Sequence, residues 1–266
     1  MTLTGIVTIV LVFAGIVIAV IAIRELKKRR QSMMDIFEMD TPAVEPTKEY
    51  HKAELLLMLD LINAFGSGFS LIGKLEFKDE SQRIIPYELT KSLHSLQCAF
   101  RLSISGYYSQ TITLLRQLTE SWLICKNCKE NPELRAYLLE GKGDRLNFFK
   151  LAESIGAEKI IYRGDFVFQS KFTHSSSISL GILKERATET LRTNPTYEKM
   201  MFLACAEVYI RNVTLMFECM YEFLASIDKN LAVNWDKQTS EVAKRTGDWQ
   251  RELRNKYGKP NQPRLT

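Results

Sequence analysis

The stretch from 194 to 223, NPTYEKMMFLACAEVYIRNVTLMFECMYEF, predicts the longest helix of the chain. Asn194 and Pro195 are typical of a helix start, because Pro at the first helical position lacks only an N–H that would be unpaired there. Apolar residues then recur at helical spacing in one stripe, made of Met201, Ala204, Val208, Leu215, Cys219 and Phe223. A helix of about 30 residues with so wide an apolar face suits the centre of a bundle.

Shorter helices are expected before this one. Thr47 is a plausible N-cap for a first helix, which Gly66-Ser67-Gly68 would break, and 69–85 would then be a loop with one helical turn. Four more are expected at 86–103, at 107–129, after the capping pair Asn131-Pro132, and at 144–155, with a sixth at 160–172. The sequence has no Gly-rich strand–helix unit, hairpin dipeptide or repeat, so the expected fold class is all-α.

Residues 5–23, GIVTIVLVFAGIVIAVIAI, carry no charged side chain and predict a transmembrane helix. At about 1.5 Å per residue the stretch nearly crosses a hydrocarbon core of about 30 Å. A basic collar follows at once, made of Arg24, Lys27, Lys28, Arg29 and Arg30, whereas residues 1–4 carry no charged side chain. The positive-inside rule therefore predicts a single-pass protein of the cell inner membrane with its N-terminus outside and a cytosolic multi-helix bundle. A cleaved signal peptide would have the opposite order of charge and apolar run.

Four regions follow from this pattern: an anchor with its basic collar at 1–30, a linker at 31–46, a helical domain at 47–228, and a basic, partly helical or disordered tail at 229–266. In the tail we expect one solvated helix at about 239–257. The alternative is a basic arm for lipid or nucleic acid, with Trp235 and Trp249 as anchors at the membrane surface.

The net charge of +5 is modest, and much of it lies at the two ends, which suits an anionic membrane surface better than a nucleic-acid groove. Five cysteines lie in apolar helical patterns, which indicates a reducing compartment and no disulfide framework. Cys125 and Cys128 form a lone C-x-x-C without two further ligands, so two core residues one turn apart are favoured over a zinc site. No metal and no cofactor are expected.

The helix at 107–129 carries the first candidate site. Arg116 and Glu120 are four residues apart and lie on one face, at the edge of an apolar arc that includes Tyr108 and Trp122. Such charges are partly desolvated, so each needs a partner. An internal ion pair that fixes helix register is one interpretation, and an anion or substrate site at the open end of the bundle is the other.

The second candidate is the segment FTHSSS at 172–177. His174 stands where a helix is expected to end, and the serines after it, including Ser175, are suited to hold its tautomer or to bind a phosphate oxygen. A structural histidine is the simpler interpretation, since no Asp-His-Ser order is present.

The Leu-Leu-Arg-x-x-x-Glu helix, the Tyr162-Arg163 segment and the late Thr-His-Ser turn together resemble a bacterial all-helical family of unknown function. That resemblance implies an Arg/Glu helix facing the His-Ser turn, with Arg163 and Ser175 nearby, but it implies no activity. The chain also has a broad similarity to HEPN-like helical proteins. It lacks their active-site pattern, because no Arg stands four to six residues before a His.

Three functions remain open from the sequence. The first is a membrane-anchored module that binds a partner or small ligand at Arg116, Glu120 and His174, in a stress or defence role. The second is a metal-independent nuclease-like effector with His174 as general acid/base and Arg116 stabilising phosphoryl charge. The third is a structural membrane scaffold. The expected partners are membrane lipids and either another protein or a second copy of the chain; nucleic acid is a possible partner that the sequence does not indicate.

Overall fold

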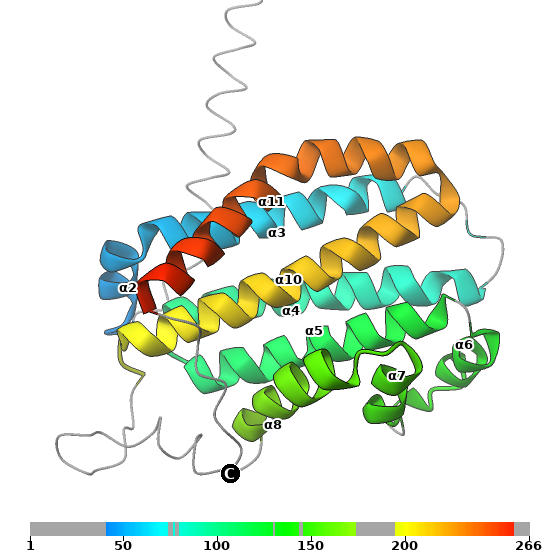
Figure 1. The fold of residues 1–266 in the computed structure, drawn as a ribbon, viewed down its shortest axis with the longest axis horizontal. Helices are drawn as coiled ribbons and strands as arrows, with labels where there is room; N and C mark the ends of the chain where they lie inside the picture. The colour runs from blue at the N-terminus through cyan, green and yellow to red at the C-terminus, as the bar shows by residue number, and fades with distance from the viewer. Residues whose placement is uncertain are drawn as a thin grey trace, which may run out of the picture. The chain divides into compact units, whose positions relative to one another are not determined.

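A computed structural model describes residues 41–73, 77, 80–129, 131–143, 146–173 and 195–257, and these residues contain helices and turns but no β-strand (Figure 1). The predicted all-α fold is therefore confirmed for this part of the chain, whereas the predicted anchor and its basic collar lie outside it. The elements are α2 (Val44–Tyr50), α3 (Lys52–Ile72), η1 (Glu80–Arg83), α4 (Ile84–Ile104), α5 (Tyr108–Cys128), α6 (Pro132–Leu139), α7 (Phe148–Ser154), η3 (Glu158–Phe166), α8 (Val167–Thr173), α10 (Lys199–Ile227) and α11 (Lys229–Tyr257).

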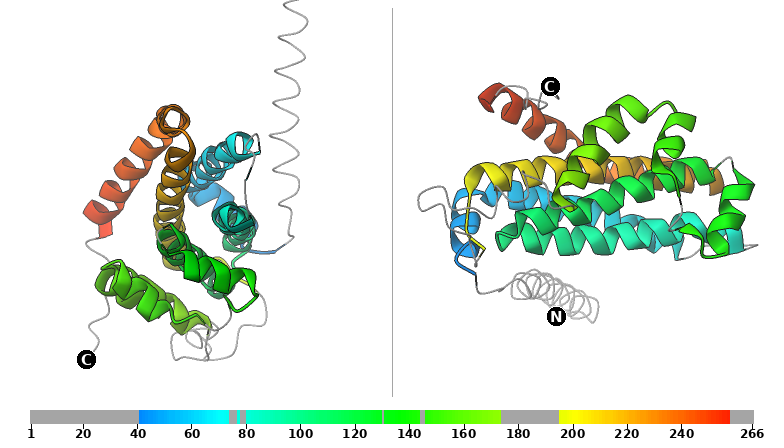
Figure 2. Two further views of the ribbon diagram at one scale, coloured as in Figure 1. Left: turned by 90° about the vertical axis from the view of Figure 1, so that its right-hand side faces the viewer. Right: turned by 90° about the horizontal axis from the view of Figure 1, so that it is seen from below.

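Helix α10 is the central element of the bundle, as its sequence predicts, but it begins at Lys199 and not at Pro195, because residues 195–198 are not helical. It packs against α3 and α11 on one side and against α4 and α5 on the other (Figures 1 and 2). Of the predicted stripe, Val208, Cys219 and Phe223 are buried. The other three members are only half-buried, because α10 touches neighbours on more than one face and its interior positions include Phe202, Tyr209, Val213, Met216 and Met220.

Helices α4 and α5 are the most extensively paired elements, and a tight turn connects them. Gly106 in this turn has φ +80°, a left-handed conformation that glycine adopts without a steric penalty. A Cβ atom here would lie 2.8 Å from the Ala43 Cβ and 3.0 Å from the Thr196 carbonyl oxygen. The turn is thus packed between the segments that lead into α2 and α10.

The start of the folded unit differs from the prediction. Thr47 is not an N-cap: it lies inside α2, fully buried, and its hydroxyl donates to the Ala43 carbonyl at 2.7 Å. The compact unit begins at Thr41, so residues 41–46 belong to it and not to the linker. His51 separates α2 from α3.

Gly66 and Gly68 do not break the first long helix, contrary to the prediction. α3 continues through both to Ile72, so the expected loop at 69–85 is shorter than predicted. The reason is a tertiary contact: a Cβ atom on Gly68 would lie 2.8 Å from the sulfur of Met220. Glycine allows α3 to approach α10 closely, and this packing outweighs its low helix propensity.

The predicted tail is also different. α11 is 29 residues long, starts ten residues earlier than expected and packs against α3 and α10. Trp235 is 1% exposed and donates from Nε1 to the Ser67 hydroxyl at 3.1 Å, so it is a core residue and not a membrane anchor. Arg245 adds an ion pair to Asp60 on α3 at 2.7 Å. The segment 229–257 is therefore part of the bundle.

Two of the described helices, α3 and α10, are long and apolar enough to cross a membrane by length and composition. Core helices of a bundle pass the same test, and both of these pack against several neighbours. The finding is therefore weak support for a second or third membrane span. The predicted span at 5–23 lies outside the residues to which the test applies.

Of the smaller helices, α6 begins as the sequence predicts, whereas α7 begins at Phe148 and not at 144. The Asn131 side chain accepts a hydrogen bond from the Leu134 N–H at 2.9 Å and caps α6, with Pro132 in the first turn. Asn147 caps α7 in the same way through the Lys150 N–H. The expected helix at 160–172 consists of η3, which is a π-helix, continued by α8, and both lie along α5 (Figure 2).

Candidate functional site

Arg116 and Glu120 form the ion pair that their spacing predicts. Arg116 Nε lies 3.1 Å from Glu120 Oε1, and the two side chains are only 21% and 24% exposed. The Nε atom is fully buried and does not meet hydrogen-bond geometry with any described group, so the contact with Glu120 is a charge–charge contact. The pair lies near the middle of α5 and not at an open end of the bundle.

Aromatic packing fixes one face of the Arg116 guanidinium. Its Cζ atom lies 4.5 Å from the ring centroid of Phe166, the last residue of η3. Phe166 is in turn stacked on Tyr162, with ring centroids 5.0 Å apart, and it contacts Phe148 at 5.6 Å. Arginine stacked on an aromatic ring and held at Nε loses little further freedom when its terminal nitrogens bind a ligand.

Those terminal nitrogens, Nη1 and Nη2 of Arg116, have no hydrogen-bond partner within the described residues, and neither is fully buried. They form the planar donor fork that recognises carboxylate and phosphate oxygens. Burial raises the pKa of Glu120, while the positive charges of Arg116 and Lys91 act in the opposite direction. The pKa of Glu120 is raised on balance, and another anion close to Arg116 would raise it further.

One helical turn along α5, three polar side chains from three helices meet in the interior. The Thr119 hydroxyl lies 2.8 Å from Asn212 Oδ1 and 3.1 Å from Gln169 Oε1, and all three residues are at most 1% exposed. A hydroxyl has one proton and cannot donate to both oxygens. The arrangement is satisfied when the Gln169 amide is turned so that Nε2, otherwise without a partner among the described residues, donates to Thr119.

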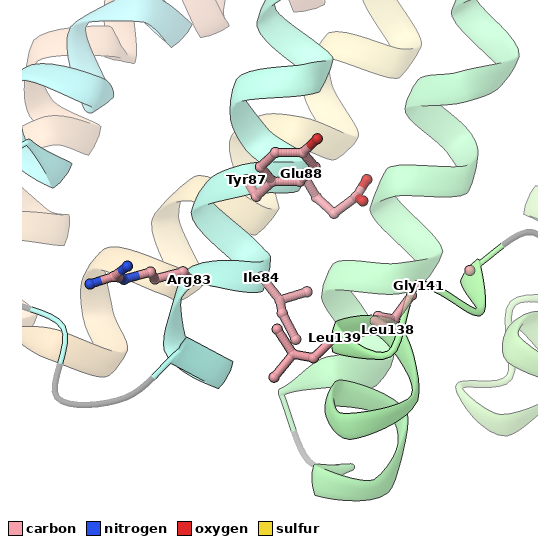
Figure 3. Close-up of a pocket in the computed structure, with 8 residues that line it drawn as sticks. Arg83, Ile84, Tyr87, Glu88, Leu138, Leu139 and Gly141 are labelled. Carbon is pink, nitrogen blue, oxygen red and sulfur yellow. The ribbon is translucent and has the colours of Figure 1, made fainter.

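A second carboxylate lies on the α4 side of α5. Glu88 is 7% exposed, and its Oε2 accepts from the Ser121 hydroxyl at 2.6 Å and forms an ion pair with Lys91 Nζ at 2.5 Å. It also lines a cavity of about 490 Å³ between the start of α4 and the end of α6 (Figure 3). In Figure 3 its carboxylate extends from α4 towards α5.

The other predicted site residues have different positions. Tyr108 is buried, its hydroxyl accepts from the Glu198 N–H at 3.1 Å, and burial raises its pKa. Trp122 donates from Nε1 to Glu218 at 3.1 Å and connects α5 to α10. Both therefore use their polar atoms inside the bundle. Arg163 is exposed on η3. His174 and Ser175 lie outside the described residues.

His51 is a buried polar site that the sequence did not single out. Its Nε2 lies 3.0 Å from the Tyr197 hydroxyl, and its ring stacks on Phe202 with centroids 4.4 Å apart. Nδ1 is buried 3.7 Å from Glu54 Oε2, beyond hydrogen-bond distance. Burial lowers the pKa of His51 and outweighs the opposing effect of Glu54, so the ring is neutral at pH 7. It joins the α2–α3 junction to the segment before α10.

The cysteines and carboxylates do not form a metal centre in the described part of the chain, where no three His, Cys, Asp or Glu side chains cluster suitably. Cys125 and Cys128 are both buried, as expected for core residues. Burial raises the pKa of Cys128 to about 12, which leaves it a neutral thiol.

Sequence alone did not identify Glu88, Gln169 or Asn212 as members of a polar interior. Glu88 and Lys91 are three residues apart near the start of a helix, and this spacing could have predicted an ion pair that involves Glu88. Gln169 and Asn212 gave no such signal, because only the packing of α8 and α10 against α5 brings them to Thr119.

Comparison with known proteins found no matching protein family, no matching curated protein and no matching solved structure.

Proposed function

We propose that this chain is a single-pass membrane protein whose cytosolic helical bundle binds a partner or small ligand through an anionic group held at Arg116. The observation that carries the proposal is the guanidinium of Arg116, which is stacked on Phe166 with both terminal nitrogens unpaired within the described residues. Such an arrangement serves recognition of a phosphate or carboxylate better than it serves helix register alone.

The surroundings of Arg116 support anion binding. The side chain is only 21% exposed, so an ion bound there is partly shielded from water and interacts more strongly with the guanidinium. Glu120 occupies only the Nε side of the fork. Because burial already raises the pKa of Glu120, its protonation upon anion binding costs less than it would in water. The expected binding is therefore stronger at lower pH.

Membrane attachment rests on the sequence of residues 5–30, an uncharged apolar stretch followed by the basic collar. Alkaline extraction of membranes from cells expressing the tagged chain tests this directly. We expect the protein in the membrane pellet, and we expect protease added to intact cells to leave the bundle uncut. Recovery in the soluble fraction, or digestion of the bundle from outside, would contradict the anchor or its orientation.

Anion binding is tested on the full chain in lipid nanodiscs, with inorganic phosphate titrated and followed by phosphorus NMR line broadening. Arg116→Gln is expected to weaken binding at least about tenfold, as loss of a partly buried charged partner does. Glu120→Gln is expected to strengthen it, because a competing negative charge is removed. Arg163→Gln, which removes an exposed arginine from η3, is the matched control and should change nothing. Equal affinity in all four proteins would refute the proposal.

A further inference from the structure

The cavity between α4 and α6 is lined by neither Arg116 nor Glu120. Its volume of about 490 Å³ lies within the range of small-molecule sites. Ile84 and Glu88 from the first turns of α4 form one wall, and Leu138 and Leu139 from the end of α6 form the other. Figure 3 shows Leu139 directed towards Ile84.

The apolar walls belong to a packed part of the bundle. Ile84 joins a buried cluster with Ile124, Cys128 and Leu134, and Leu138 packs against that cluster. At the mouth, Tyr87 is 71% exposed and Leu139 is 47% exposed. A rigid apolar wall with large exposed apolar side chains at its entrance is typical of a site that takes an apolar ligand body.

Glu88 gives the cavity its polar group. Oε2 of Glu88 accepts from Ser121 and forms an ion pair with Lys91, whereas Oε1 has no partner within the described residues and is not fully buried. A carboxylate with one oxygen fixed and one unpaired is oriented to accept from a ligand. Lys91 is 42% exposed, so its ammonium can move into water when a ligand cation replaces it.

The charge of the lining favours a cation. Glu88 is a buried acid, and the other charged residue of the lining, Arg83, is exposed and extends away from the other labelled side chains in Figure 3. An anion here would face a carboxylate in a partly desolvated space, which is unfavourable. A neutral ligand would leave the negative charge shared only with Lys91.

We propose that the cavity between α4 and α6 binds a small organic amine, with its ammonium group on Glu88 and its apolar body between Ile84, Leu138 and Leu139. The amine exchanges with Lys91 at the carboxylate, so that one ammonium replaces another and the net charge of the site is kept. The two sites have no lining residue in common, and amine binding at Glu88 does not require an anion at Arg116, although Lys91 and Glu88 both act on the pKa of Glu120.

The test uses the full chain in lipid nanodiscs and calorimetric titration with phenethylamine, after subtraction of the heat from empty nanodiscs. Two probes of similar size, neutral 2-phenylethanol and anionic 3-phenylpropionate, are titrated in parallel. Phenethylamine is expected to bind at least about tenfold more tightly than either, since the ammonium–carboxylate contact is the added interaction.

Two variants and one control decide the assignment. Glu88→Gln keeps an acceptor for Ser121 and is expected to abolish the preference for the amine. Leu139→Trp, at a position exposed enough to tolerate the larger ring, fills the entrance and is expected to weaken the binding of all probes. Glu133→Gln, an exposed acid on α6, should leave phenethylamine affinity unchanged. Equal affinity for amine and alcohol, or an unchanged preference in Glu88→Gln, overturns the proposal.

Discussion

Replacing Gly68 by alanine tests how closely α3 approaches α10. In the interior of a helix, Gly→Ala alone stabilises by about 0.5–1 kcal/mol, because glycine loses more backbone freedom on folding. At Gly68, however, the new methyl group would lie 2.8 Å from both Cε and Sδ of Met220 and 3.0 Å from its Cγ. Met220 is fully buried, so its chain has little room to move.

Overpacking of this kind costs about 1–3 kcal/mol. The helix-propensity gain offsets part of it, and Gly68→Ala is therefore expected to destabilise the bundle by up to about 2 kcal/mol. Gly66, two residues earlier in the same helix, is the matched control. A Cβ atom there meets nothing within 4 Å, so Gly66→Ala is expected to stabilise by about 0.5–1 kcal/mol.

The assay is urea unfolding of the full chain, followed by tryptophan fluorescence from Trp122, Trp235 and Trp249. The double variant Gly68→Ala with Met220→Ala should recover the gain seen for Gly66→Ala, relative to Met220→Ala alone. If both single glycine variants stabilise equally, α3 and α10 are not in close contact at this point. If both destabilise strongly, the helix is broken at these glycines.

Two further predictions concern pH and the last helix. Burial lowers the folded-state pKa of His51, so only the unfolded state takes up this proton as pH falls below about 6.5. Stability should then fall by up to about 1.4 kcal/mol per pH unit until the folded-state pKa is reached. His51→Gln should reduce that slope in urea titrations, and an unchanged slope would contradict the prediction. Trp235→Ala should cost about 3–5 kcal/mol by thermal or urea unfolding. Half-buried Trp249→Ala should cost much less, and equal effects would refute the packing of α11.

The helices that sequence predicted well are those with strong local signals. α10 has a long apolar pattern, and α6 begins with a cap, Asn131, followed directly by Pro132. Each signal acts within a few residues, so packing does not have to be known. The break expected at Gly66 and Gly68 was wrong for the opposite reason, since the use of Gly68 is decided by Met220, 152 positions later in the sequence.

The last helix was underestimated because its buried stripe is weakly apolar. Its buried residues are Ala232, Trp235, Thr239 and Thr246, at spacings of three, four and seven. The spacing is helical, but two of the four are threonines whose hydroxyls donate to backbone carbonyls within the helix. A small polar residue satisfied in this way can be buried at little cost. The polar composition of α11 therefore predicted a solvent-exposed helix, whereas the spacing of its buried residues is that of a helix packed along one face.

Only the part of the candidate site that lies within one helix could be predicted from the sequence. The pairing of Arg116 with Glu120 depends on one helix and was predictable, and the structure contains it. Phe166, Gln169 and Asn212 come from η3, α8 and α10, and their approach to α5 depends on how three helices pack. The spacing of residues along the chain does not predict which residues of different helices come into contact.

The polar side of α5 explains why the two proposed sites lie where they do. A buried polar group is costly unless it is paired, and α5 has its Thr119 and Ser121 hydroxyls paired by groups from α4, α8 and α10. This cross-helix pairing fixes how the helices pack, although some buried atoms, such as the Tyr209 hydroxyl and His51 Nδ1, have no hydrogen-bond partner among the described residues. Within the same part of the chain, the terminal nitrogens of Arg116 and Oε1 of Glu88 are likewise unpaired. Both retain access to solvent, so these two groups are available to ligands.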